Sequence, residues 1–201
     1  MVFNPIRVPI NLYGQITPQK KRLIFLKCGV KGKPEGIIRI GDHLALSGDG
    51  QVHTIDLIKK NLVIGENEGH LRIRFDIEPP SGAIDKYGKL IWYEKRNWRA
   101  ELEVINGGIQ PVADGDVYMN LAPESGYSSG PIEIGFNKND SGYRKDIYNQ
   151  RYYIKSNDNS YYAQITIDYR AILSSNKPEL RYKGKLNPSG SRNLEYFARK
   201  Y

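Results

Sequence analysis

Cysteine and histidine are scarce in this sequence. With a single cysteine, Cys28, among 201 residues, the chain can form neither an intramolecular disulfide nor a cysteine-based metal cluster. The three histidines fall on different predicted segments and no HExxH-type pair occurs, so no zinc site is expected. No motif for another cofactor is present, and we expect the protein to use none.

Long apolar runs are also missing. No stretch of 18 apolar residues occurs, so no helical membrane span is expected. The N-terminal residues 1–7 lack the basic and apolar regions of a secretory signal. These absences favour a cytoplasmic protein or a component of a virion.

Motifs for nucleophilic catalysis and for phosphate-binding loops are absent. No G-x-S-x-G elbow occurs, and the Gly/Lys-rich segment 29–33 lacks the Walker spacing. One catalytic candidate is the acidic pair Glu101 and Glu103, because glycosidases place carboxylates on a strand face in this way. A like-charge pair beside Arg99 is more often part of a surface ladder. We therefore expect a non-enzymatic protein.

Positive charge dominates, but it is unevenly distributed along the chain, whose net charge is +8. Residues 1–41 contain eight Lys/Arg and one Glu, and residues 145–201 contain eleven Lys/Arg and five Asp/Glu. Residues 42–144 are acidic, with eleven Lys/Arg against sixteen Asp/Glu. Such segregation is typical of a solvated surface, and it also suits contact with a polyanion or with the acidic middle of a neighbouring copy.

Strand-like alternation is the clearest pattern that the sequence does contain. Apolar and polar residues alternate along residues 161–170, and the preceding residues 157–160 are all turn formers. These features predict a β-hairpin over residues 148–170. Pairing Ser156 with Tyr161 sets its expected register: Ile154 opposite Ala163, Tyr152 opposite Ile165, and Tyr148 opposite Tyr169.

Similar short strands recur about every 8–12 residues, and no amphipathic helix is evident. This pattern predicts an all-β fold, a two-sheet antiparallel β-sandwich of jelly-roll type with little or no helix. We expect one domain over residues 1–201, with an extended arm at about 1–20 and a tail at about 186–201. The strands are expected at 6–12, 23–28, 37–40, 44–46, 52–58, 70–77, 90–93, 98–105, 117–121, 132–136, 148–156, 161–170 and 180–186.

The outer face of the predicted hairpin is basic and carries tyrosines. Such a face can stack on nucleic-acid bases or sugar rings while its cations contact phosphates. It can also pack against another subunit, since Tyr and Arg are enriched at interface centres, and tyrosine is in any case a common strand residue. The candidate binding or interface residues are Arg151, Tyr153, Lys155, Tyr162, Gln164 and Arg170.

These observations favour a structural subunit that self-associates or joins other subunits in a particle or filament, such as a virion. The chain is strand-rich, has extended ends and lacks catalytic and cofactor motifs. The alternative is a carbohydrate- or single-stranded nucleic-acid-binding module that uses the Tyr/Arg face. A glycan-active enzyme using Glu101 and Glu103 is a third possibility.

Overall fold

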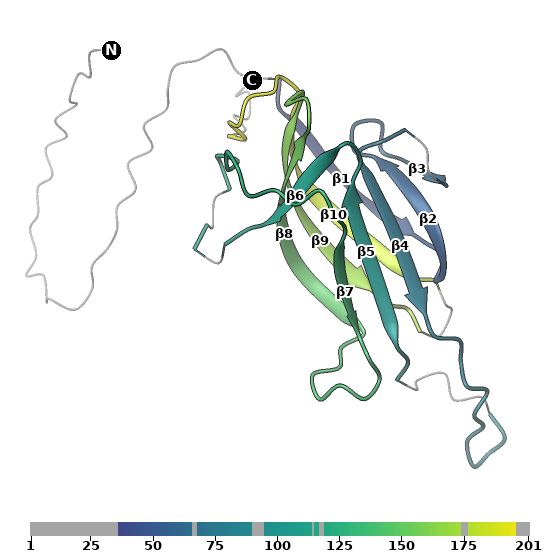
Figure 1. Cartoon of the computed structure of the whole chain (residues 1–201). Coiled ribbons are helices and arrows are strands. Elements are labelled where there is room, and N and C mark those ends of the chain that lie inside the picture. The colour runs from purple at the N-terminus through teal and green to yellow at the C-terminus, as the bar shows by residue number, and fades with distance from the viewer. Residues whose placement is uncertain are drawn as a thin grey trace, which may run out of the picture. The chain divides into compact units, whose positions relative to one another are not determined.

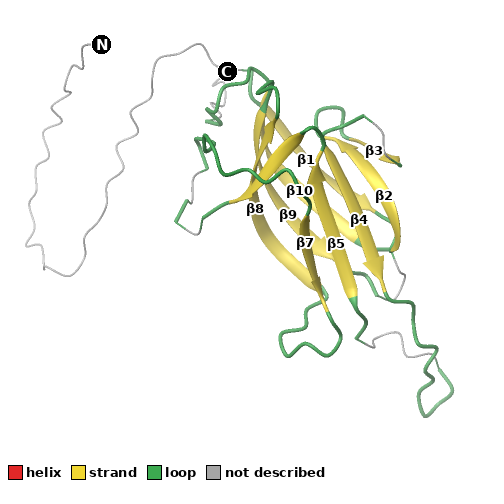
Figure 2. Ribbon diagram, viewed as in Figure 1, coloured by secondary structure: helices red, strands yellow, loops and turns green. Residues whose placement is uncertain are grey.

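Two antiparallel five-stranded sheets make up the fold (Figures 1 and 2). The computed structural model describes residues 36–65, 68–89, 95–113, 115–116, 119–173 and 177–195. These residues form ten strands and no helix, so this part of the chain offers no helix that could span a membrane. The predicted two-sheet β-sandwich is therefore confirmed.

We call the two sheets A and B. Sheet A has the strand order β1 (Ile38–Ala45), β10 (Glu179–Asn187), β9 (Tyr162–Arg170), β8 (Asp146–Ser156) and β6 (Gly107–Pro111). Sheet B has the order β3 (Asn61–Ile64), β2 (Asp49–Asp56), β4 (Leu71–Ile77), β5 (Trp98–Val104) and β7 (Ile132–Phe136). The first and last described strands, β1 and β10, pair along the whole of β1, so chain segments far apart in sequence share one sheet.

The core lies between the sheets because every second side chain of the central strands points inward. In β4 and β5 the buried residues alternate with more exposed ones, as the sequence pattern predicts. Phe75 of sheet B and Tyr169 of sheet A, both fully buried, lie 6.3 Å apart between ring centroids and join the two sheets. Burying an aliphatic or aromatic side chain of this kind stabilises the fold by about 1.5–3 kcal/mol.

The hairpin of β8 and β9 follows the predicted register over most of its length. Ile154 lies opposite Ala163 and Tyr152 lies opposite Ile165. The prediction is wrong at Tyr148, because a bulge places Ile147 opposite Tyr169.

The cause of this bulge lies at Asn149, whose φ is +58°. The backbone N–H of Asn149 donates to the Asp168 carboxylate at 2.7 Å, which stabilises the irregular residue. Tyr148 is consequently 52% exposed instead of entering the core.

One further strand boundary differs from the predictions. Residues Gly41 and Asp42 do not break a strand, because β1 runs through them in register with β10. Residues 105 and 106 turn the chain from β5 of sheet B into β6 of sheet A, so the strand predicted at 98–105 ends close to the predicted position. Asn106 has φ +48°, and a Cβ on Gly107 would lie 2.4 Å from the Lys155 carbonyl oxygen, so this turn needs glycine.

Other predictions fall wholly or partly outside the described residues: the arm, the strands at 6–12, 23–28 and 90–93, and part of the strand at 117–121. In that last segment Leu121 makes an isolated bridge with Asn193. The described part of the predicted tail packs on the sandwich, where Leu194 is fully buried. Strands β3 and β6 were not anticipated.

Candidate binding face on sheet A

All six residues singled out from the sequence lie on the side of sheet A that faces away from the sandwich core. They are not equally accessible. Tyr153 and Tyr162 are only 2% and 5% exposed, because they pack with Met119, Ala122 and Leu194 in a second apolar cluster. The expected open face of tyrosine rings is therefore not present at these two positions.

Tyr153 connects this second apolar cluster to Asp116. Its hydroxyl donates a hydrogen bond to the Asp116 carboxylate, and the Arg151 guanidinium donates to the Asp116 carbonyl at 2.8 Å. Burial and the hydrogen bond to Asp116 both raise the pKa of Tyr153, because each disfavours the phenolate. Lys155 lies over the same cluster, with its ammonium 5.8 Å from the ring centroid of Tyr162.

The rest of the outer face is organised by cross-strand register, which aligns residues of four strands in rows. One row across β1, β10, β9 and β8 consists of Arg39, Lys185, Gln164 and Tyr153. The next row consists of Gly41, Lys183, Thr166 and Arg151. We call these two the cationic rows, because they hold four cations and no carboxylate.

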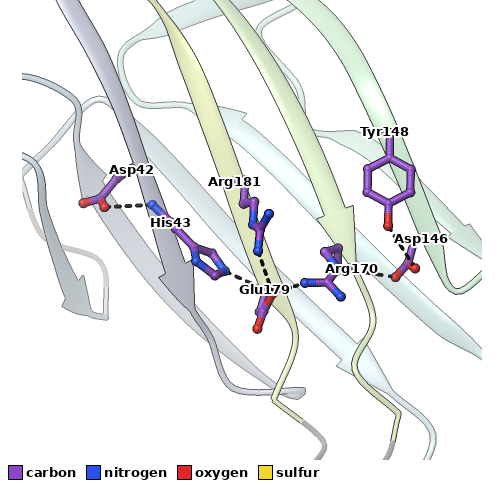
Figure 3. A network of polar contacts seen from close by, with 7 residues as sticks. All are labelled: Asp42, His43, Asp146, Tyr148, Arg170, Glu179 and Arg181. Carbon is purple, nitrogen blue, oxygen red and sulfur yellow. Dashed lines mark hydrogen bonds and ion pairs between the residues drawn. The ribbon is translucent and has the colours of Figure 1, made fainter.

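The following two rows are different, because their charges neutralise one another (Figure 3). Glu179 is central: its carboxylate lies 3.0 Å from His43 Nε2, 2.5 Å from Arg170 and 4.0 Å from Arg181. The hydrogen bond from His43 is the main cause that lowers the pKa of Glu179, and the neighbouring arginines add to it. Arg170, a predicted binding residue, is thus engaged in a network that also includes Asp146, 4.0 Å from its Nε.

A cavity of about 260 Å³ lies where the cationic and the neutralised rows meet. It is lined by Asp42, His43, Thr166, Asp168, Arg181, Tyr182 and Lys183. The lining contains two carboxylates as well as Arg181 and Lys183, so this hollow is polar and of mixed charge.

The outer face of sheet B does not show this separation of cations from carboxylates. Arg72 lies 3.3 Å from Glu103, and Arg99 contacts both Glu101 and Glu133. Glu101 and Glu103, the candidate catalytic pair, thus each have a guanidinium partner. This is the surface ladder that the sequence analysis gave as the more common arrangement.

The acidic residues at positions 114, 116 and 124 do not form one site among the described residues. Asp114 lies outside the described residues, and Asp116 accepts the Tyr153 hydroxyl and the Met119 N–H. Glu124 pairs instead with Arg192 at 3.3 Å. The described carboxylates therefore serve contacts within the fold.

The cationic residues of β1 and β10 were missed by sequence reasoning. Alternation along residues 180–186 would have placed Lys183 and Lys185 on one face. The pairing of β10 with β1, which brings Arg39 opposite Lys185, has no local sequence signal.

Comparisons with known proteins add little to this description. No known protein family and no curated protein matches the sequence. Among solved structures, the apo form of an HmuY analogue from Tannerella forsythia matches at 8% identity and a TM-score of 0.42, over 76% of this chain and 98% of that chain. A likeness this distant supports no conclusion about function.

Proposed function

We propose that this protein is a non-enzymatic assembly subunit that joins a particle or filament by binding an acidic surface through the cationic rows of sheet A. The observation that carries the proposal is the register that collects Arg39, Lys183, Lys185 and Arg151 in two adjacent rows without a carboxylate.

The geometry of the rows supports binding to an extended acidic surface. Neighbouring strands lie about 4.8 Å apart and successive residues on one face about 6.7 Å apart, so the backbone positions of the four cations fall within about 16 Å. A facing anionic surface complements cations that are gathered on one face in this way. Charge complementarity of this kind fixes orientation and speeds association.

A second candidate function is binding of a single-stranded polyanion, which the same rows also favour. The burial of Tyr153 and Tyr162 weighs against it, because recognition of unpaired bases normally uses exposed aromatic rings. The same burial weighs against a carbohydrate-stacking platform at these positions.

Charge reversal tests the proposal. We would compare the unmodified chain with Lys183→Glu/Lys185→Glu, and with Lys59→Glu/Lys60→Glu as a control of equal charge change on an exposed loop of sheet B. The measurements are native mass over a range of concentrations and salt, and binding to poly-glutamate as a mimic of an acidic protein surface.

We expect self-association or poly-glutamate binding that weakens with salt, is lost in Lys183→Glu/Lys185→Glu and persists in the control. Preference for a single-stranded oligonucleotide over poly-glutamate would instead identify the second candidate. A monomer that binds neither polyanion at low salt would overturn the proposal.

A further inference from the structure

An ordered turn projects from one end of the sandwich, between β4 and β5 (Figure 1). The Asp85 carboxylate accepts the backbone N–H groups of Tyr87 and Lys89, both at 2.9 Å. The backbone closes the same turn, with Asp85 N–H donating to the Lys89 carbonyl at 2.7 Å. Gly88 takes the left-handed conformation, φ +78°, that the turn requires. We call residues 83–89 the tip.

The tip exposes large apolar side chains to solvent. Ile84 is 62% exposed and Tyr87 is 74% exposed, although the turn that carries them is held by hydrogen bonds. Lys86 and Lys89 flank them and are also exposed, with the Lys86 ammonium 5.0 Å from the Tyr87 ring centroid. An aliphatic residue, a tyrosine and two lysines thus share one convex turn.

The base of this loop is fixed to the β7–β8 loop. The Tyr143 hydroxyl donates to the Arg96 carbonyl at 2.9 Å, and the Trp98 indole donates to the Arg144 carbonyl at 2.8 Å. Lys138 joins the two loops through a 2.7 Å ion pair with Glu78. The two loops therefore form one preorganised end of the sandwich.

This end is basic in its described residues. Its carboxylates serve local contacts: Glu78 pairs with Lys138, Asp85 holds the tip, and Asp140 accepts the Asn137 N–H at 2.8 Å. Cations outnumber these three carboxylates among residues 78–89, 95–97 and 137–145. Those cations with exposed side chains are Lys86, Lys89, Lys95, Lys138, Arg144 and Lys145.

We propose that this end of the protein docks on an anionic lipid bilayer, with Ile84 and Tyr87 inserted at the interface and the surrounding lysines facing lipid headgroups. Tyrosine is suited to the boundary between headgroups and acyl chains, because it has an apolar ring and a polar hydroxyl. Basic residues close to an anionic leaflet each strengthen binding about fivefold.

A bilayer fits the tip better than a protein partner does. A convex turn with two apolar side chains covers little area, whereas a stable protein interface buries roughly 800 Å² on each partner. A fluid bilayer needs no complementary groove, and binding through a few apolar groups plus cations is typical of interfacial anchors.

Vesicle co-sedimentation of the full chain tests the inference. The probes are vesicles of phosphatidylcholine alone and of phosphatidylcholine with phosphatidylserine. The variants are Ile84→Ser/Tyr87→Ser and Lys86→Glu/Lys89→Glu, and the control is Ile64→Ser, which removes an equally exposed apolar residue (61%) from β3. Because all the altered side chains are exposed, unchanged thermal melting would show that each variant folds.

We expect binding to the phosphatidylserine vesicles only, weakened about tenfold or more by either tip variant and unaffected by Ile64→Ser. A Tyr87→Trp variant should then show a blue shift of its emission on these vesicles. The inference is overturned if the unmodified chain does not bind, or if the tip variants bind as well as it does. It is also overturned if Lys183→Glu/Lys185→Glu abolishes vesicle binding while the tip variants retain it, since the cationic rows would then be the lipid contact.

Discussion

Arg39 of β1 lies directly opposite Lys185 of β10, so two cations occupy one cross-strand position on the outer face of sheet A. The neighbouring row adds Lys183 and Arg151 without adding a carboxylate. Positive charge is thus concentrated in one half of the face, while Glu179 and its partners neutralise the other half. We propose that this division of charge is the functional feature of the fold.

We expect Glu179 to limit the positive electrostatic potential on the outer face of sheet A. Replacing Glu179 by Gln removes the central carboxylate of the network and extends the positive region to Arg170 and Arg181. We expect Glu179→Gln to strengthen poly-glutamate binding or self-association several-fold at low salt, and to cost less than about 1 kcal/mol of stability.

Glu133→Gln on sheet B removes the same charge at a distant position and provides the control. Binding that weakens in Glu179→Gln, or that strengthens equally in both variants, would contradict a local role for the network.

Tyr153 should matter for stability, because its hydroxyl binds the Asp116 carboxylate at a largely buried position. Tyr153→Phe removes the donor to Oδ2 of that carboxylate while the Met119 N–H still binds Oδ1, and we expect a loss of about 1–3 kcal/mol in the free energy of unfolding by urea denaturation. The matched control is Tyr148→Phe, whose hydroxyl contacts Asp146 at an exposed site and should contribute less than about 0.5 kcal/mol. Equal effects of the two variants would refute the anchoring role.

Leu194 tests whether the C-terminal segment is part of the folded unit. Its side chain is fully buried in the cluster with Tyr153 and Tyr162. Leu194→Ala should therefore destabilise the protein by about 2–5 kcal/mol through lost burial and the cavity left behind. An unchanged unfolding free energy would mean that this segment does not cover sheet A in solution.

His70 should make stability depend on pH. Its Nδ1 accepts the Leu57 N–H at 3.2 Å, an arrangement that requires a neutral ring with the proton on Nε2. Burial lowers the pKa of His70 and Lys59 lowers it further, while the nearby Asp56 carboxylate, 3.4 Å away, opposes them. The unfolded chain therefore binds a proton at His70 more readily than the folded chain does.

The contribution of His70 is accordingly full above pH 6.5, its ordinary pKa, and decreases as the pH falls below that value. Urea unfolding followed between about pH 7.5 and pH 5 should show this decrease. His70→Gln keeps an acceptor for the Leu57 N–H but does not titrate, so it should have a flatter profile. The same slope in both proteins would exclude His70 as the cause.

The sequence was informative where structure depends on neighbouring residues. Alternation along β9 placed Ile165 and Ile167 in the core and Gln164 on the outer face, because strand geometry alone decides this. The burial of Tyr153 and Tyr162 could not be predicted in the same way, since it depends on distant residues such as Met119 and Leu194 that cross over the sheet.

The cationic rows were missed for a similar reason. They need β1 beside β10, a pairing between segments at opposite ends of the described chain. The bulge that exposes Tyr148 depends on a hydrogen bond from Asn149 to Asp168 in the partner strand, which the alternation pattern does not encode.

The most direct test of the account is sedimentation analysis of the unmodified chain at low and high salt, beside Lys183→Glu/Lys185→Glu and the charge-matched control Lys59→Glu/Lys60→Glu. We predict an assembly, or a complex with poly-glutamate, that dissociates in high salt, is lost in Lys183→Glu/Lys185→Glu and survives in the control. Equal association by all three proteins, or no association by any of them, would contradict it.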